Sequence, residues 1–232
     1  MEKKIQDNEL GTIIVRESQR AKHYTLKITN GTIYAILPVG GDVERLLGFI
    51  HENKAKIQKA LEKHPRKEIL SEASQLQTAT FRLHIFRSQQ KSFYMKLAEN
   101  ELHISCPEET RFEEESVQKL LKGAIEKALR HEAQRLLPQR LEQLARQFNF
   151  SYTAVKINKS RTHWGCCTSK KNINLSLYLM LLPWPLIDYV LLHELCHTIE
   201  MSHNERFWQQ MDSVTQGKAT QLRQELKQYH PL

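Results

Sequence analysis

The segment His193-Glu194-Leu195-Cys196-His197 constrains this chain more than any other, because it sets polar side chains on an apolar helix. Between Pro185 and Ile199 the apolar residues recur with a helical period, and Pro185 suits the first turn. Positions four apart share a helix face, so His193 and His197 point the same way. Burying two imidazoles and a carboxylate costs free energy unless something binds them. The fold must therefore bring a partner to this face.

His203 supplies a third imidazole beyond the predicted helix, where it reaches the other two only if the chain turns back. Three imidazoles would leave zinc an open fourth position for water. Glu194 lies one residue around the helix, beside that position. The spacing predicts a metal-dependent hydrolase with one zinc ion per chain, held by His193, His197 and His203, and with Glu194 as the general base.

Other side chains near the motif compete for these roles. Glu200 is the rival third ligand, because zinc also accepts carboxylate oxygen, but no turn signal separates it from His197. Cys196 is expected to be a small buried hydrophobe, since it points away from both histidines of the motif. Cys166 and Cys167 are adjacent on an extended segment and face opposite ways, so they are not expected to bind one ion together.

Composition limits the class of protein. The chain has 232 residues, 40% of them hydrophobic, which is enough for one large domain or two small ones. No apolar run reaches the roughly 18 residues of a membrane span. The opening residues Met1-Glu2-Lys3-Lys4 lack the hydrophobic stretch of a signal peptide. The four cysteines show no disulfide spacing, so we expect reduced thiols in a cytoplasmic protein without a membrane partner.

Residues 1–110 are predicted to form a β-rich N-terminal region. Short β-prone runs are expected to be strands at 12–16, 24–29, 32–37, 81–86, 92–97 and 101–106. Asn30-Gly31 predicts a hairpin between the second and third of these, and 98–100 a turn before the last. Asp42 is a plausible N-cap for a helix that continues to about Lys63.

Residues 111–232 are predicted to be mainly helical, which gives an α+β fold class for the chain. A long helix is expected from the acidic run at 113–115, broken or kinked at Pro138, with a second piece to about Phe148. Residues 152–157 are expected to form a strand. Alternating apolar side chains predict another strand at 172–181, which could hold an extended peptide beside the site.

The net charge of +8 is spread along the chain, +3 in residues 1–110 and +5 in residues 111–232, as on an ordinary solvated surface. Residues 151–187 nevertheless contain no acidic side chain. Basic and aromatic side chains together could contact phosphates and stack bases, although a plain basic face is the simpler interpretation. The candidate contacts to nucleic acid or substrate are Lys156, Lys159, Arg161, His163, Trp164, Lys170 and Lys171.

Residues 161–169, 172–175, 193–197 and 203–208 resemble the YgjP-like metallopeptidase family, which is related to the SprT and Spartan-like zinc proteases. The likeness extends over nearly the whole chain. It implies a zincin-like metallopeptidase domain, at residues 111–232, with an HExxH active-site helix. It also implies that the zinc ligands are His193, His197 and His203 and that Glu194 is the catalytic glutamate.

The chain departs from related patterns at two points. Where the family usually has Arg-Trp-Gly-Ser-Cys, this chain has His163-Trp164-Gly165-Cys166-Cys167. The histidine spacing also matches the metzincin pattern, but Glu200 occupies its glycine position. Because glutamate resists the positive φ that glycine adopts there, we expect a turn of different shape and do not assign the chain to the metzincins.

Three classes of function compete. A zinc peptidase acting on proteins or peptides is favoured. A DNA-associated SprT-like protease would add the basic stretch as a recruiting surface, and a non-catalytic zinc-stabilised binding module would need a fourth ligand that closes the ion off. Peptidase activity measured with and without DNA would separate the three.

Overall fold

The computed structural model describes residues 2–7, 9–29, 31–63 and 69–230. The chain forms two compact units, Met1–Glu68 and Ile69–Leu232. This division lies well before residue 110, where the sequence changes from predicted strands to predicted helices. The strands between the two positions share a hydrophobic core with the helices that follow them, which is why they belong to the second unit.

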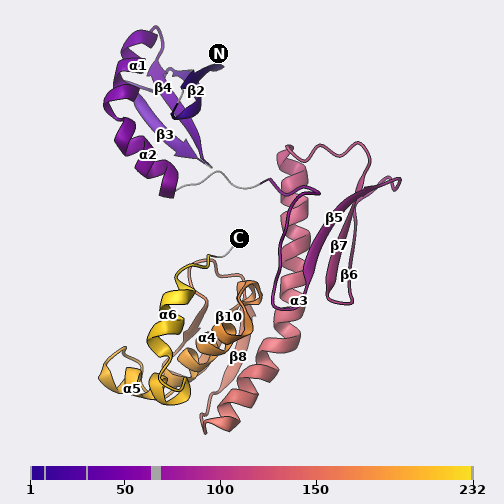
Figure 1. The fold of residues 1–232 in the computed structure, drawn as a ribbon. Helices are drawn as coiled ribbons and strands as arrows, with labels where there is room; N and C mark the ends of the chain where they lie inside the picture. Colours follow the sequence, from indigo (N-terminus) through magenta and orange to yellow (C-terminus); the bar gives the residue numbers. More distant parts are fainter. Residues whose placement is uncertain (1, 8, 30, 64–68, 231–232) are drawn as a thin grey trace. The chain divides into compact units, whose positions relative to one another are not determined.

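The N-terminal unit is a four-stranded sheet with two helices (Figure 1). Its strands are β1 (Glu2–Asp7), β2 (Gly11–Ser18), β3 (Thr25–Thr29) and β4 (Thr32–Pro38), in the order β1-β2-β4-β3. Three of them were expected, and β1 was not. The predicted hairpin falls partly on Asn30, outside the described residues, while β3 and β4 pair antiparallel on either side of it. Alternate residues of β2 and β4, such as Ile13, Ile33 and Leu37, form the core.

The helical part of this unit is interrupted at Asn53. Asp42 caps α1 (Val43–Glu52) as predicted, since its carboxylate accepts from the Glu44 N–H. The helix then ends, because Asn53 turns its side-chain amide onto the Phe49 carbonyl at 2.9 Å. A second helix, α2 (Lys54–Lys63), follows directly. The single helix expected from Asp42 to Lys63 is therefore two.

The second unit begins with a three-stranded sheet of β5 (Arg82–Ser88), β6 (Tyr94–Ala98) and β7 (Glu101–Pro107), in the order β5-β7-β6. All three strands were expected within one or two residues. The turn between β6 and β7 uses Glu99 and Asn100 in left-handed conformation, with φ of 52° and 61°. Leu83, Ile85, Leu102 and Ile104 turn one face of the sheet into the core.

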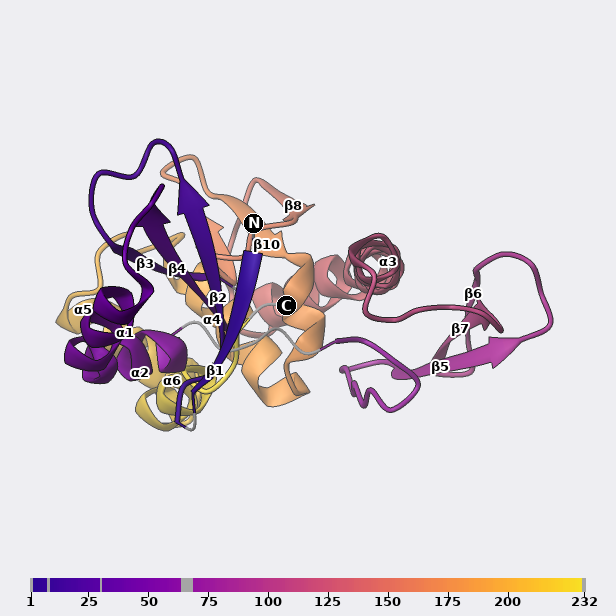
Figure 2. The same cartoon turned by 90° about the horizontal axis from the view of Figure 1, so that it is seen from above.

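Helix α3 (Glu115–Gln147) is one continuous element of 33 residues that contains Pro138. The expected break does not occur. Leu137 and Leu141, on either side of the proline, are fully buried, and this packing offsets the roughly 3 kcal/mol that an internal proline costs. The sheet of β5–β7 lies on one side of α3, and the remaining elements of the unit lie on the other (Figures 1 and 2).

The C-terminal part holds a second small sheet and three helices. Its strands are β8 (Ala154–Asn158), β9 (Gly165–Cys167) and β10 (Asn172–Ser176), in the order β8-β10-β9, and β9 was not expected. The strand predicted at 172–181 is shorter, because Ser176 caps a 3-10 helix, η1 (Leu177–Leu181), buried from Leu177 to Met180. Helices α4 (Trp184–Cys196), α5 (Glu205–Val214) and α6 (Ala219–Leu226) follow.

Among the helices described, none has both the length and the apolar composition needed to cross a membrane.

Candidate metal centre

Helix α4 presents the first two polar residues of the site. Pro185 lies in its first turn, and nine of its residues are buried, from Leu186 to Cys196. Asp188 accepts both bonds of a bidentate pair from Arg140 of α3, at 2.7 and 2.6 Å, which fixes α4 against that helix. His193 and Glu194 lie in the last turn, and His197 is the C-cap. Since the helix ends here, Ile199 lies outside it and is 64% exposed, contrary to the predicted apolar stripe.

The chain turns back after His197, which is what brings His203 into the site. Thr198 donates its hydroxyl to the Leu195 carbonyl, and the Glu200 carboxylate accepts from both the N–H and the hydroxyl of Ser202. Asn204 then caps α5 through the Phe207 N–H. Within the described residues no position from 197 to 203 has positive φ, so this turn needs no glycine at Glu200.

The three imidazoles converge through their Nε2 atoms. The distances are 3.2 Å from His193 to His197, 3.1 Å from His197 to His203, and 3.0 Å from His203 to His193. The Nδ1 of His197 lies 3.0 Å from the Glu200 carbonyl. A carbonyl only accepts, so Nδ1 carries the proton and the Nε2 of His197 offers a lone pair to the centre.

Phe207 of α5 packs against all three histidines. Its ring lies 4.9, 4.6 and 4.8 Å from the rings of His193, His197 and His203. Trp208 stacks on His203 from the side, with Arg223 over the indole. Burial, with the neighbouring histidines adding to it, lowers the pKa of His193 to about 3. The ring is therefore neutral at physiological pH, as a metal ligand must be.

Glu194 is buried beside this group, with 4% of its surface exposed. Its Oε2 has no hydrogen-bond partner among the described residues. Burial raises the pKa of this carboxyl to about 8. Gly165, the first residue of β9, lies directly against it: a Cβ at that position would be 2.8 Å from both Cγ and Oε1 of Glu194. The carboxyl thus fits only because position 165 has no side chain.

The segment between β8 and β9 is held by an acidic residue of α3. Glu126 accepts from Arg161 at 2.7 Å and from the buried Tyr178 hydroxyl at 2.5 Å, and it also pairs with Lys159. Arg161 donates to the Tyr178 oxygen as well, at 2.9 Å. Although burial opposes it, this set of donors lowers the pKa of Glu126 to about 2. We call Glu126, Lys159, Arg161 and Tyr178 the Glu126 cluster.

The remaining predicted residues are scattered. Lys156, His163, Lys170 and Lys171 are exposed, whereas Trp164 packs against the hydrophobic core. Two of the five basic residues of the acid-free stretch, Lys159 and Arg161, pair with Glu126, which offsets one of their two positive charges. Cys196 is fully buried, as expected. Cys166 is exposed and Cys167 half-buried, and neither belongs to a cluster that could hold a metal among the described residues.

Sequence reasoning did not identify Glu126 or the contact of Gly165 with Glu194. Both contacts join segments far apart in the chain, so no local spacing signals them.

The three histidines fit a zinc ion. A tetrahedral site with zinc–nitrogen bonds of about 2.0–2.1 Å places its nitrogens roughly 3.3 Å apart, close to the observed 3.0–3.2 Å. The described residues contain this one group that could hold a metal ion. Glu200 does not belong to it, since its carboxylate is engaged with Ser202.

Three comparisons with known proteins were made. None of the curated proteins searched matches the chain. Among solved structures, the crystal structure of the metallopeptidase zymogen of Pyrococcus abyssi abylysin aligns with 42% of this chain and 100% of its own, at 20% identity and a TM-score of 0.37. The model of the YgjP-like metallopeptidase domain matches residues 22–229. Because that match covers nearly the whole chain, the protein belongs to the YgjP-like metallopeptidase family.

Proposed function

We propose that this protein is a zinc-dependent peptidase of the HExxH type, with His193, His197 and His203 as metal ligands and Glu194 as general base. The observation that carries the proposal is the meeting of three Nε2 atoms within 3.2 Å beside a buried carboxyl group. Membership of a metallopeptidase family supports it. Neutral imidazoles and a carboxylate are the donor set that such chemistry requires.

When bound, zinc would supply positive charge that polarises a peptide carbonyl, lowers the pKa of water and favours the ionised form of Glu194. Glu194 accepts the proton of the attacking water and passes it to the leaving amine. Its Oε2 is free for this purpose, because no described residue donates to it. Gly165 leaves the space that the Glu194 carboxyl occupies, and the ring of Phe207 packs against all three imidazoles.

The substrate that suits this site is an extended peptide. The sequence suggested that a strand starting at residue 172 pairs with the peptide. That strand, β10, lies between β8 and β9, so both of its edges are already occupied. Strand β9 is instead the last strand of this sheet, and its first residue contacts Glu194. A peptide that adds to β9 would therefore pass next to the general base.

The test replaces Glu194 by Gln, which keeps the shape of the side chain but cannot take the proton. We expect zinc content to stay at one per chain while hydrolysis of an unfolded protein falls by at least about 100-fold. Glu200→Gln is the matched control, since Glu200 is a nearby half-buried carboxylate that lies outside the group of three histidines, and it should stay close to the parent. Unchanged hydrolysis by Glu194→Gln would remove Glu194 from the mechanism, and a parent without stoichiometric zinc would remove the metal.

A further inference from the structure

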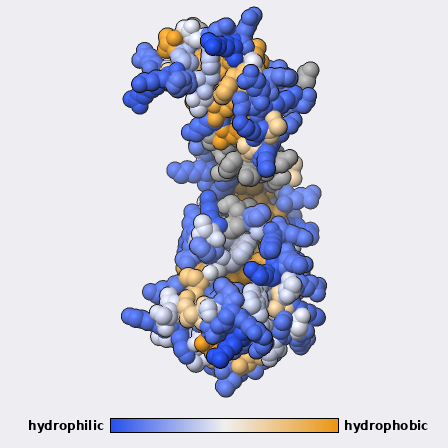
Figure 3. Space-filling view, turned by 90° about the vertical axis from the view of Figure 1, so that its left-hand side faces the viewer, coloured by the Kyte–Doolittle hydropathy of each residue, from blue (hydrophilic) through white to orange (hydrophobic). Residues whose placement is uncertain are grey.

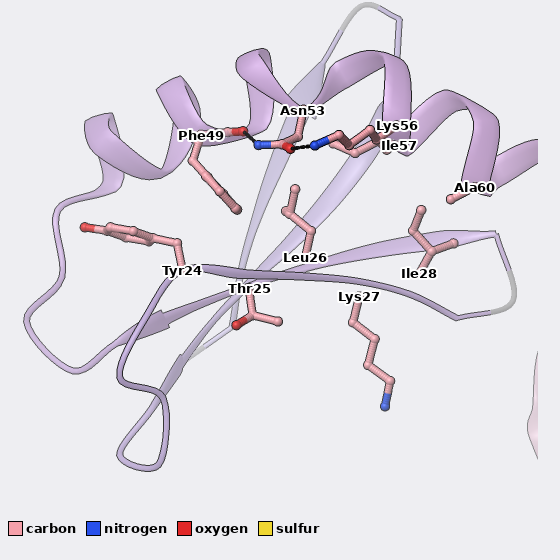
Figure 4. A pocket seen from close by; sticks show the side chains of 10 residues that line it. All are labelled: Tyr24, Thr25, Leu26, Lys27, Ile28, Phe49, Asn53, Lys56, Ile57 and Ala60. Atoms are coloured by element: carbon pink, nitrogen blue, oxygen red, sulfur yellow. Dashed lines mark hydrogen bonds between the residues drawn. The ribbon is translucent and has the colours of Figure 1, made fainter.

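The N-terminal unit contains a groove of about 580 Å³ between strand β3 and the two helices (Figure 4). Tyr24, Leu26 and Ile28 line it from the strand side, and Phe49, Ile57 and Ala60 line it from α1 and α2. Figure 4 shows the side chains of Leu26 and Ile28 turned towards the helices, with those of Thr25 and Lys27 on the opposite side of the strand. The groove therefore has an apolar interior and a polar outer face, in the alternation of a β-strand.

One wall of the groove is the open edge of a sheet. β3 stands last in the order β1-β2-β4-β3. In an antiparallel ladder, every second residue of the last strand directs its N–H and C=O away from its partner. No backbone hydrogen bond from another described segment reaches residues 25–29. Such an edge is a template for one more extended chain.

The charge at the groove selects the kind of chain. Lys27 on β3 and Lys56 on α2 are both exposed and both line the groove, and none of its described lining residues is acidic. The N-terminal unit in the upper part of Figure 3 shows hydrophobic surface bordered by hydrophilic side chains. An added strand with apolar side chains towards the helices and carboxylates on the opposite side, beside Lys27, would match both the apolar interior and the positive charge.

We propose that the N-terminal unit binds an extended peptide segment in which apolar and acidic residues alternate, by adding it as a strand to β3. Backbone bonds to β3 would hold the segment, and its apolar side chains would enter the groove between Leu26, Ile28, Phe49 and Ile57. Its acidic side chains would lie on the side of Lys27. This site lies outside the unit that carries the three histidines, so it does not depend on the peptidase assignment.

The experiment measures binding of a fluorescein-labelled peptide in which valine alternates with glutamate, by fluorescence anisotropy. The full chain is used with Glu194→Gln, so that the probe is not cleaved. Two further probes replace the glutamates by lysine or the valines by serine. We expect saturable binding of the valine–glutamate peptide with a Kd below about 1 mM and no saturation by the other two.

Two matched substitutions on α2 locate the binding. Ala60 lines the groove, so Ala60→Phe fills it and should raise the Kd by at least about tenfold. Ala55 is exposed on the same helix and does not line the groove, so Ala55→Phe should leave the Kd within about twofold. Lys27→Glu should weaken binding of the glutamate probe and strengthen that of the lysine probe. Thermal unfolding of each variant checks that the unit is folded.

Several results would overturn the proposal. The first is a parent that does not bind the valine–glutamate probe. The second is an Ala60→Phe variant that binds the probe as tightly as the parent does. If zinc chelation then abolished this binding, the peptide would be placed at the histidines instead. The third is a concentration-dependent dimer that Ala60→Phe dissolves, which would assign the edge of β3 to a second copy of the chain. None of these results bears on whether Glu194 catalyses hydrolysis.

Discussion

Gly165 and Glu194 come from distant segments, and each determines what the other position can hold. A side chain at 165 would overlap the carboxyl group that we assign as general base, at 2.8 Å. The glycine is needed here for space rather than for backbone freedom, since its φ is not in the left-handed region.

We predict that Gly165→Ala lowers kcat by about 10- to 100-fold while zinc stays bound, because Glu194 must shift by several tenths of an ångström. Steady-state kinetics together with elemental analysis measure the two effects. Gly123→Ala on α3 is the matched control: nothing lies within 4 Å of its Cβ, and it should stabilise the helix by about 0.5–1 kcal/mol. Parental kcat in Gly165→Ala would show that Glu194 tolerates the shift.

A second prediction at this scale separates the two candidate third ligands. His203→Ala removes one of three converging nitrogens, so its zinc affinity should fall by more than about 100-fold. Glu200→Ala removes a carboxylate that is engaged with Ser202 and Asn204, and it should bind zinc like the parent. Competition with a chromophoric chelator ranks the two variants. The reverse order would transfer the third ligand to Glu200.

The sequence predicted that the three imidazoles would meet, as they do in the structure, but it did not predict the residues that surround them. The i, i+4 spacing places His193 and His197 on one face whatever the rest of the fold does. The prediction for His203 needed only a chain that turns back after His197. We expected this turn to differ from one with glycine at position 200, and Glu200 indeed has no positive φ. Gly165 and Glu126 could not be found in this way, because their partners lie 29 positions and at least 33 positions away in the chain.

At the scale of elements, the Glu126 cluster ties the segment before β9 to the long helix. Ser176 adds to it by donating its hydroxyl to the Ser160 carbonyl at 2.6 Å and its N–H to the Trp164 carbonyl at 2.9 Å. The last residue held by these bonds is Trp164, which directly precedes Gly165. The position of β9 against α4 therefore depends on a carboxylate of α3.

We predict that Glu126→Gln destabilises the second unit in a pH-dependent manner. The folded pKa of Glu126, about 2, lies below its ordinary value of 4.5, so its ionised form stabilises the fold fully above pH 4.5, and that stability is lost as the pH falls towards 2. The loss in the variant should approach about 3 kcal/mol at neutral pH as an upper bound. Urea unfolding of parent and variant at pH 7 and pH 3 measures it. An equal difference at both values would contradict the ionic role.

Helices and strands were predicted correctly where the pattern of apolar residues continues through the whole element. They were missed where a local side-chain contact ends the element before the pattern ends. Asn53 divides a helix with its own side chain, and Ser176 turns an alternating run into a 3-10 helix. Pro138 shows the opposite, since burial on both sides keeps a helix intact through a residue that usually ends one. The three-residue strand β9 has too few residues for a period.

For the whole molecule, the open question is whether the basic surface binds nucleic acid. We predict that a fourfold variant, with Lys156, Lys159, Lys170 and Lys171 changed to Gln, binds DNA no more weakly than the parent. Glu126 pairs with both Lys159 and Arg161 and offsets one of their two positive charges, which lowers the positive charge available for counterion release. A gel-shift titration at about 50 and 200 mM salt compares the two. Strong, salt-sensitive binding by the parent alone would instead support a recruiting surface.

The sequence predicted two regions that meet near residue 110, but it did not show that the division into two compact units lies between Glu68 and Ile69. The strongest signal along the chain is the change from strands to helices near residue 111, but a hydrophobic core joins residues across it. The separation is set by which side chains pack together: Leu46 and Ile57 complete one core, while Phe81 and Leu129 belong to the other. Such a property depends on three-dimensional contacts rather than on local periodicity.

The continuous helix α3 also restricts where related chains can differ in length. Its 33 residues carry β5–β7 on one side and the histidine-bearing part on the other. Each inserted residue would rotate one end against the other by about 100° and lengthen the helix by about 1.5 Å. A single insertion or deletion in α3 would thus expose one core, whereas seven residues, close to two whole turns, would nearly restore the orientation. Natural length variation should therefore collect in the loops and spare this helix.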